Sequence, residues 1–212
     1  MSRLHRLLIP LLLALPGCSG LLHSSAPALQ LYVLQPLPTV SAGSAPQAAA
    51  PSLRIARPLP GPGLNTDRIA LLRPGNRLDY YAGSRWSAPL TELVSDLQLS
   101  VLGADSAWSA VADDRSSFNT DYLLQTSIES FTAEYTTEAA PPVIRVELHC
   151  LLIRRSDGAL LGSFATTQRQ AAQENRMASV VLAFSQAADQ AIRSVQAQAD
   201  ALLRFAKSPA AP

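Results

Sequence analysis

The chain has 212 residues, of which 48% are hydrophobic and 16% are charged, and its formal net charge is +1. This length suits one domain with a well-filled core, with or without tails. Because a nearly neutral protein has no strong attraction for polyanions, we expect no nucleic-acid partner.

Residues 1–17 are predicted to be a signal peptide. Arg3 and Arg6 form a short basic start, and an apolar run from Leu7 to Leu15 follows. A basic start, a short apolar core and a small residue before the cut are typical of secretory signals. The apolar run is about half the ~20 residues that a membrane-spanning helix needs. Removal of the two arginines changes the net charge from +1 to −1.

The cysteine at position 18 ends the sequence LPGC, which resembles the lipobox of bacterial lipoproteins. In a lipobox the thiol receives a diacylglycerol before cleavage, and the new amino terminus is usually acylated too. Each buried methylene contributes roughly 0.8 kcal/mol and one acyl chain anchors only marginally, so two or three chains give firm attachment. We therefore predict lipidation of Cys18, and a plain cleaved signal with an incidental cysteine is the alternative. The residue after the cysteine is Ser19 rather than an aspartate. In this the sequence resembles lipoproteins that are sorted to the outer membrane, so we expect the protein on its periplasmic face.

The chain after the signal divides into a tether, one domain and a short tail. Residues 18–28 are mostly small and polar, and an extended tether of this length reaches roughly 30 Å at ~3.1 Å per residue. Residues 29–207 carry the hydrophobic periodicity of a single domain. Residues 208–212 are expected to be a disordered tail.

The first half of the domain is predicted to hold four strands and one helix. The turn signals PGN and LPGPG separate apolar stretches, so we expect strands at 29–34, 52–58, 67–73 and 77–86, the last two forming a hairpin. From residue 88 the period changes to that of a helix, which Gly103 ends. The apolar face of this helix consists of Leu90, Leu93, Val94, Leu97 and Val101.

The second half is predicted to hold further strands and one long helix. Strands are expected at 109–112, 121–135 and 143–154, with a tight hairpin at Asp157–Gly158 that returns through 160–167. Apolar residues alternate with polar ones along 143–154, so one face of that strand packs and the other stays wet. A long amphipathic helix is expected at 174–207. The fold class is therefore α+β, with a mainly antiparallel sheet, one shorter helix and a long C-terminal amphipathic helix packed on one face.

Residues capable of catalysis or metal binding are sparse. Glu147 and His149 lie two residues apart on one strand face and could act as acid and base, but an ordinary exposed charge pair is the commoner arrangement. One histidine and one cysteine in the domain cannot fill a tetrahedral zinc site. Cys150 has the apolar register of its strand, so core packing is expected rather than a reactive thiol. We expect no metal, no cofactor other than the covalent lipid, and no enzymatic activity.

Arginine is concentrated in one part of the sequence. Residues 54–85 contain six arginines and two aspartates, which gives a local charge of +4. Arginine and tyrosine are common among the residues that carry binding energy in interfaces, whereas Trp86 is expected to fill the core. The alternative is that these charges are solvated strand edges. On charge and aromaticity alone, the predicted partner-binding residues are Arg54, Arg57, Arg73, Tyr81 and Arg85.

The region 53–98 resembles a known protein family. Its sequence is LRIARPLPGPGLNTDRIALLRPGNRLDYYAGSRWSAPLTELVSDLQ. This run, the strand YVLQP near the start of the domain and the long closing helix are similar to the ABC-type transport auxiliary lipoprotein family. No short catalytic motif defines that family, so the resemblance is to a scaffold.

The resemblance implies a non-catalytic role in the cell envelope. Such proteins are outer-membrane lipoproteins that partner an MCE-domain protein and an ABC permease and ATPase in moving lipids between the two membranes. Docking of the periplasmic MCE partner at the outer membrane is implied, with a homo-oligomeric ring as one arrangement. Two alternatives stay open: a lipoprotein regulator of a peptidoglycan synthase, and a periplasmic carrier that holds an acyl chain between sheet and long helix.

Overall fold

The structure is a computed structural model that describes residues 28–37, 50–104, 107–137 and 139–207. The predicted signal peptide, Cys18, the tether before Ala28 and the predicted tail lie outside these residues. Neither helix of the described part combines the length and the apolar character of a membrane span.

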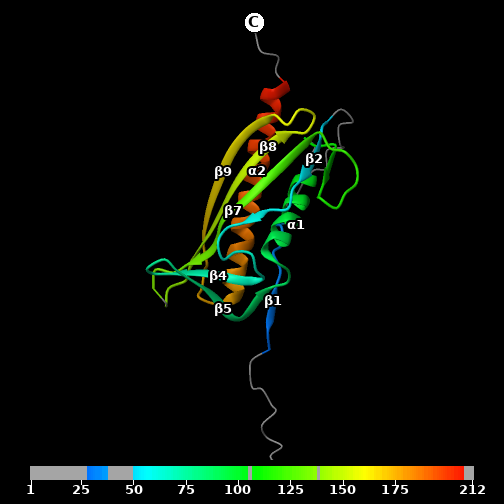
Figure 1. The fold of residues 1–212 in the computed structure, drawn as a ribbon. Helices are drawn as coiled ribbons and strands as arrows, with labels where there is room; N and C mark the ends of the chain where they lie inside the picture. The colour runs from blue at the N-terminus through cyan, green and yellow to red at the C-terminus, as the bar shows by residue number, and fades with distance from the viewer. Residues whose placement is uncertain (1–27, 38–49, 105–106, 138, 208–212) are drawn as a thin grey trace, which may run out of the picture.

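The described residues form nine strands and two helices (Figure 1). The predicted order of strands and helices is confirmed, with one strand added by the structure at Leu59–Pro60. In chain order the elements are β1 (Gln30–Tyr32), β2 (Ser52–Ile55), β3 (Leu59–Pro60), β4 (Arg68–Arg73), β5 (Arg77–Trp86), α1 (Leu90–Gly103), β6 (Ala110–Ala112), β7 (Tyr122–Glu134), β8 (Val143–Arg154), β9 (Leu160–Ala171) and α2 (Met177–Lys207).

The α+β class is confirmed, but the sheet is mixed, and this corrects the prediction of a mainly antiparallel sheet. Antiparallel pairs join β4 to β5, β7 to β8 and β8 to β9. Parallel pairs join β1 to β5, β2 to β6, and β7 to each of β2, β3 and β4. Antiparallel neighbours share a hairpin turn that leaves a local sequence signal, whereas these parallel pairs join segments that are distant in the sequence.

Strand β7 organises the sheet. One edge pairs with β8 along almost its whole length, from Tyr122 opposite Arg154 to Glu134 opposite Val143. The other edge receives β2, β3 and β4 one after another along the strand. A single long strand therefore holds together segments from most of the domain (Figure 1).

The core lies between the sheet and the two helices. The predicted inward face of β8 is confirmed, since its apolar residues are almost inaccessible to solvent: Ile144, Val146, Leu148, Cys150 and Leu152. Helix α2 contacts β8, β9 and α1, and it runs along one face of the sheet (Figure 1). A side chain at Gly162 of β9 would meet Leu202 of α2, because a Cβ there would lie 2.6 Å from the Leu202 Cδ1 atom.

An aromatic cluster joins three elements at the centre of this core. The ring centroid of Phe184 in α2 lies 5.1 Å from that of Phe131 in β7 and 5.3 Å from that of Trp86 in β5. The Phe131 and Phe184 rings are stacked, and Trp86 meets both edge-on. Trp86 is 2% exposed, which confirms its predicted core position.

The N-terminal segment is attached to both layers. Strand β1 pairs with β5, and Leu34 just beyond it is buried. The main-chain N–H of Leu37 donates to Asp189 of α2 over 3.2 Å, and the same buried carboxylate pairs with Arg193 at 2.7 Å. Figure 1 shows that β1 begins at the end of the molecule opposite to the C-terminal end of α2.

Candidate functional site

Arg54 of β2 holds a neighbouring loop. Its guanidinium donates to three main-chain carbonyls, those of Asp113 at 2.8 Å, Ser116 at 3.0 Å and Phe118 at 2.5 Å. These carbonyls belong to the loop after β6, the strand next to β2, so the side chain ties β2 to that loop. A role for Arg54 in partner binding stays a prediction.

Arg57 lines a cavity of about 290 Å³ between β2, α1 and the loop after β6. Its guanidinium lies 3.3 Å from Glu92 Oε1, and its main-chain N–H donates to Asp114 at 2.9 Å. On the same rim a hydrogen bond from Arg115 lowers the pKa of the Asp113 carboxyl. The charges around this cavity are thus largely paired with one another, and no histidine lines it.

Arg73 and Tyr81 lie on the β4–β5 hairpin, away from this cavity. Arg73 pairs with Asp79 at 3.5 Å. The Tyr81 hydroxyl lies 2.7 Å from that of Tyr135, which itself donates to Asn175 at 2.8 Å. Tyr135 has one proton to give, so Tyr81 is the donor between the two tyrosines. Burial, reinforced by the bond to Tyr135, raises the pKa of Tyr81 above its ordinary value.

Arg85 of β5 occupies a third location. Its Nη1 atom lies 3.0 and 3.1 Å from the two carboxylate oxygens of Asp67. In the sheet register Arg85 is next to Leu31 of β1. The five predicted residues are therefore spread over three parts of the surface rather than brought together, and binding by any of them stays a prediction.

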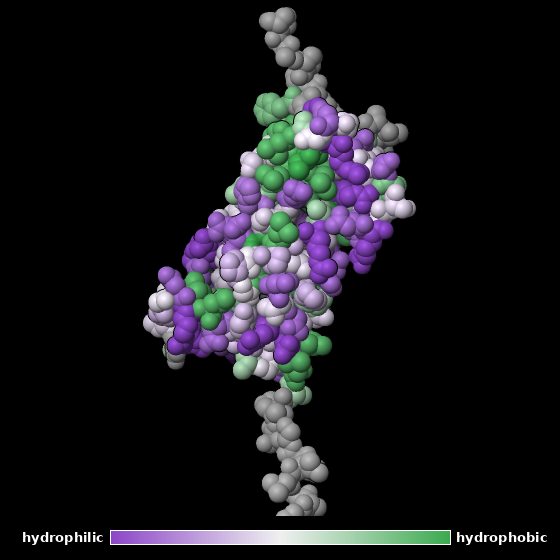
Figure 2. Space-filling view, viewed as in Figure 1, coloured by the Kyte–Doolittle hydropathy of each residue, from purple (hydrophilic) through white to green (hydrophobic). Residues whose placement is uncertain are grey.

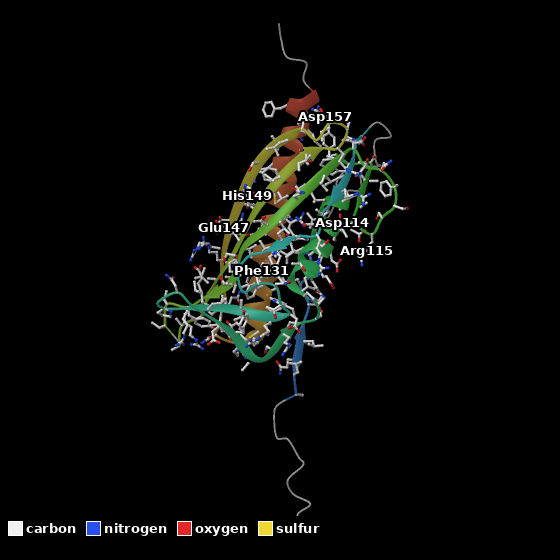
Figure 3. The ribbon with its side chains drawn as sticks, viewed as in Figure 1. Asp114, Arg115, Phe131, Glu147, His149 and Asp157 are labelled. Atoms are coloured by element: carbon white, nitrogen blue, oxygen red, sulfur yellow. The ribbon has the colours of Figure 1, made fainter. Side chains whose placement is uncertain are left out.

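Glu147 and His149 project from the wet face of β8 but have separate partners (Figure 3). Glu147 pairs with Arg145 at 2.5 Å, whereas the Nε2 atom of His149 lies 2.8 Å from the Ser163 hydroxyl. The first pair lies along β8 and the second crosses from β8 to β9, so both are ordinary pairings of polar groups on the solvated face of a sheet. Within the described part of the chain, no group of three or more His, Cys, Asp or Glu side chains is placed to hold a metal ion.

Cys150 is a core residue, as its register predicts. The side chain is fully buried, and its sulfur lies 3.6 Å from the Thr126 hydroxyl. Burial raises the pKa of the thiol to about 11. The thiolate is the reactive form of cysteine, so a buried thiol of this kind should be inert.

The reactivity of Cys150 gives a direct test. We expect the folded Cys18→Ser protein to be inert to a thiol reagent at pH 8, where about one Cys150 thiol in a thousand is ionised and the reagent has no access. The same protein in guanidinium chloride should react fully, at one thiol per chain. Rapid labelling of the folded protein would contradict both the burial and the raised pKa.

The outer face of the sheet carries an apolar patch that the sequence reasoning missed. Leu123 of β7 is opposite Ile153 of β8, which in turn is opposite Leu160 of β9, and Leu151 is two residues further along β8. Leu160 is 57% exposed, and the other three are half-buried without belonging to the core. We call these four residues the distal apolar patch: Leu123, Leu151, Ile153 and Leu160.

The distal apolar patch lies at the end of the molecule away from the start of β1. Figure 1 shows the β8–β9 hairpin at that end, and Figure 2 shows apolar surface gathered there. Its sequence signal is the stretch CLLIR (150–154), where Leu151 and Ile153 occupy the positions that Arg145, Glu147 and His149 occupy further down the strand. When a strand with one solvent-exposed face carries apolar residues on that face as well, the exposed face is expected to contact a partner.

Comparison with solved structures shows relatives of this fold. Protein XCC0632 from Xanthomonas campestris, of family DUF330, superposes with a TM-score of 0.69 and is 22% identical, covering 83% of this chain and 98% of that one. The hypothetical protein CT253 from Chlamydia trachomatis superposes with a TM-score of 0.51 at 8% identity, covering 73% of this chain and 98% of the other. At these identities the likeness shows the fold alone.

Sequence comparison identifies the family. No curated protein matches the chain. The family model described as "ABC-type transport auxiliary lipoprotein component" matches residues 32–196, which is most of the chain and nearly all of the folded domain. This match agrees with the resemblance of the region 53–98, and the protein belongs to the family of ABC-type transport auxiliary lipoprotein components.

Proposed function

We propose that this protein is an outer-membrane lipoprotein that docks the periplasmic MCE-domain partner of an ABC-type lipid transporter. Its role is non-catalytic: acyl chains on Cys18 hold it to the membrane, and the folded domain binds the partner. Membership of the auxiliary lipoprotein family supports the association with an ABC permease and ATPase. The observation that carries the docking role is the distal apolar patch.

The distal apolar patch has the composition and geometry of a binding surface. Directly paired residues on neighbouring strands have Cβ atoms about 4.5–5.5 Å apart, so Leu123, Ile153 and Leu160 form a continuous apolar row across three strands. A contiguous apolar surface on a soluble domain typically marks a site of interaction. His149 and Ser163 border the patch and supply the polar rim that such interfaces have.

The position of the patch suits a partner that approaches from the periplasm. The tether enters the domain at the start of β1, and the patch lies at the other end (Figure 1). A protein held through Cys18 therefore presents the patch away from the membrane. The proposal includes a homo-oligomeric ring, in which this surface would be repeated around a central partner.

The core favours docking over carriage of an acyl chain. An acyl-chain carrier would need free space between the sheet and α2. At the centre of that layer, Trp86, Phe131 and Phe184 pack with ring centroids 5.1 to 6.2 Å apart. These rings occupy the volume that a chain would take there.

The test is recovery of partners from detergent-solubilised envelope. We expect the wild-type protein to recover an MCE-domain protein with its permease and ATPase. The Leu160→Asp variant should recover about tenfold less, because a charge buried within an apolar contact costs at least ~1–2 kcal/mol of binding. Leu160 is largely exposed in the free protein, so the substitution should leave folding intact.

Ala171→Asp is the matched control. It adds the same charge to an exposed position at the opposite end of the same strand, so it should recover the partner as wild type does. Equal recovery by both variants would remove the patch from the proposal. Failure of the wild-type protein to recover any MCE or permease subunit would remove the proposed function itself.

A further inference from the structure

Three exposed aliphatic side chains lie in a row where the chain enters the domain. Leu29, Leu31 and Val33 are 53%, 62% and 51% exposed. Residues of alternating position in a strand share a face, so all three point outward, while Tyr32 and Leu34 pack toward the core. Figure 2 shows this apolar surface at the end of the molecule where β1 begins.

The strand that carries this row is an edge strand. Within the described residues β1 pairs with β5 and with no other strand, so its outer edge is open. Exposed apolar edge strands are usually blunted or covered in native proteins. The row Leu29, Leu31 and Val33, beside this open edge, is a contiguous apolar surface of the kind that marks a contact site.

Arginines flank the row on the neighbouring strands. Leu31 is beside Arg85 of β5, and Arg85 is beside Arg68 of β4. Arg85 pairs with Asp67, and the Arg68 guanidinium carbon lies 3.9 Å from the centroid of the Tyr80 ring, which leaves this corner with one excess positive charge. Aliphatic side chains bordered by arginine suit the boundary between acyl chains and anionic headgroups.

The length of chain between Cys18 and the row limits how far the row can lie from the membrane. Nine residues, 19–27, separate Cys18 from Ala28, and they span at most roughly 30 Å when extended. With Cys18 held in a bilayer, Leu29, Leu31 and Val33 are the apolar side chains of the described domain that lie nearest to the anchor in the sequence, and they meet that surface first. A second copy is a weaker occupant, since a strand of three residues offers little of the ~1,200 Å² that stable interfaces bury.

We propose that Leu29, Leu31 and Val33, bordered by Arg68 and Arg85, form a membrane-contacting face that lies on an anionic lipid surface. The inference rests on the proposed acylation of Cys18 and goes beyond it, because the acyl chains attach the protein whereas this face orients it. The domain then stands on the bilayer with the distal apolar patch directed away from it.

The test places a polarity-sensitive fluorophore at the face. Leu31→Cys is labelled in the full lipidated protein, where Cys18 is acylated and Cys150 is buried, so the introduced thiol is the reactive one. The protein is reconstituted in vesicles of phosphatidylethanolamine and phosphatidylglycerol. Leu160→Cys, labelled in the same way, is the matched control, because its leucine is similarly exposed at the far end of the domain.

We expect blue-shifted emission at position 31, and quenching by doxyl-labelled lipid several-fold stronger there than at position 160. Equal quenching at both positions, in protein that still floats with the vesicles, would overturn the membrane-contacting face and leave the anchor intact. A blue shift at position 31 that disappears when the protein is diluted among excess vesicles would assign the row to a second copy. Protein that does not float with vesicles would overturn the acylation of Cys18 and this inference with it.

Discussion

The Phe184→Ala variant is expected to lose about 3–5 kcal/mol of unfolding free energy. Phe184 is fully buried in α2 and lies within 5.3 Å, centroid to centroid, of both Phe131 and Trp86. Truncation removes the contacts of two aromatic neighbours at once and leaves a cavity that neighbouring strands cannot collapse to fill. Domains of this size are stable by only ~5–15 kcal/mol, so this single change would remove a large part of the total.

Equilibrium unfolding in urea measures this loss. Leu182→Ala is the matched control, since it lies two residues away on the same helix but is 48% exposed. An exposed leucine should cost no more than about 0.5 kcal/mol when truncated. Comparable losses in the two variants would mean that α2 does not pack on the sheet through the aromatic cluster.

Local patterns predicted most of the elements correctly. The five apolar residues expected on the first helix are all buried in α1. The alternation of 143–154 gave the correct inward face of β8, because one residue type per face is enough to orient a half-buried strand. The hairpins β4–β5 and β8–β9 were visible through their turns, which include glycines at positive φ, Gly75 and Gly158.

Long-range pairing could not be predicted in this way. The segment LPGPG predicts a turn, yet Leu59–Pro60 pairs with β7 as β3, and the Gly61 N–H donates to the Ile128 carbonyl at 2.9 Å. Proline lacks the N–H of a regular ladder, so nothing local signals a strand. The absence of a side chain at Gly61 permits the approach, since a Cβ there would lie 2.8 Å from the same carbonyl oxygen.

For the predicted binding residues, too, the sequence indicates local character but not long-range contacts. Charge and aromaticity indicate which side chains can bind, but not whether a distant part of the fold already engages them. The donors of Arg54 bond to carbonyls about 60 residues away, and Tyr81 bonds to Tyr135, which directly follows β7. The distal apolar patch could have been predicted from the sequence, because Leu151 and Ile153 break the apolar–polar alternation of their own strand.

Replacing Cys18 by serine is expected to abolish lipid attachment. Each acyl chain contributes roughly 0.8 kcal/mol per buried methylene, and stable anchoring needs more than one chain. Serine has no thiol to alkylate, so the Cys18→Ser protein should incorporate no radiolabelled palmitate. The loss of palmitate incorporation should be complete, whereas a substitution in the folded domain should leave incorporation unchanged.

Cys150→Ala separates the chemistry of position 18 from a general effect of removing cysteine. Cys150 is fully buried among core residues, so its thiol cannot reach the acylating enzyme, and this variant should incorporate palmitate as wild type does. A Cys18→Ser protein that still takes up palmitate, or a wild-type protein that takes up none, would contradict the anchor. The proposed orientation of both apolar surfaces depends on that anchor. Without it, no bilayer would be held near the membrane-contacting face, and nothing would direct the distal apolar patch away from the membrane.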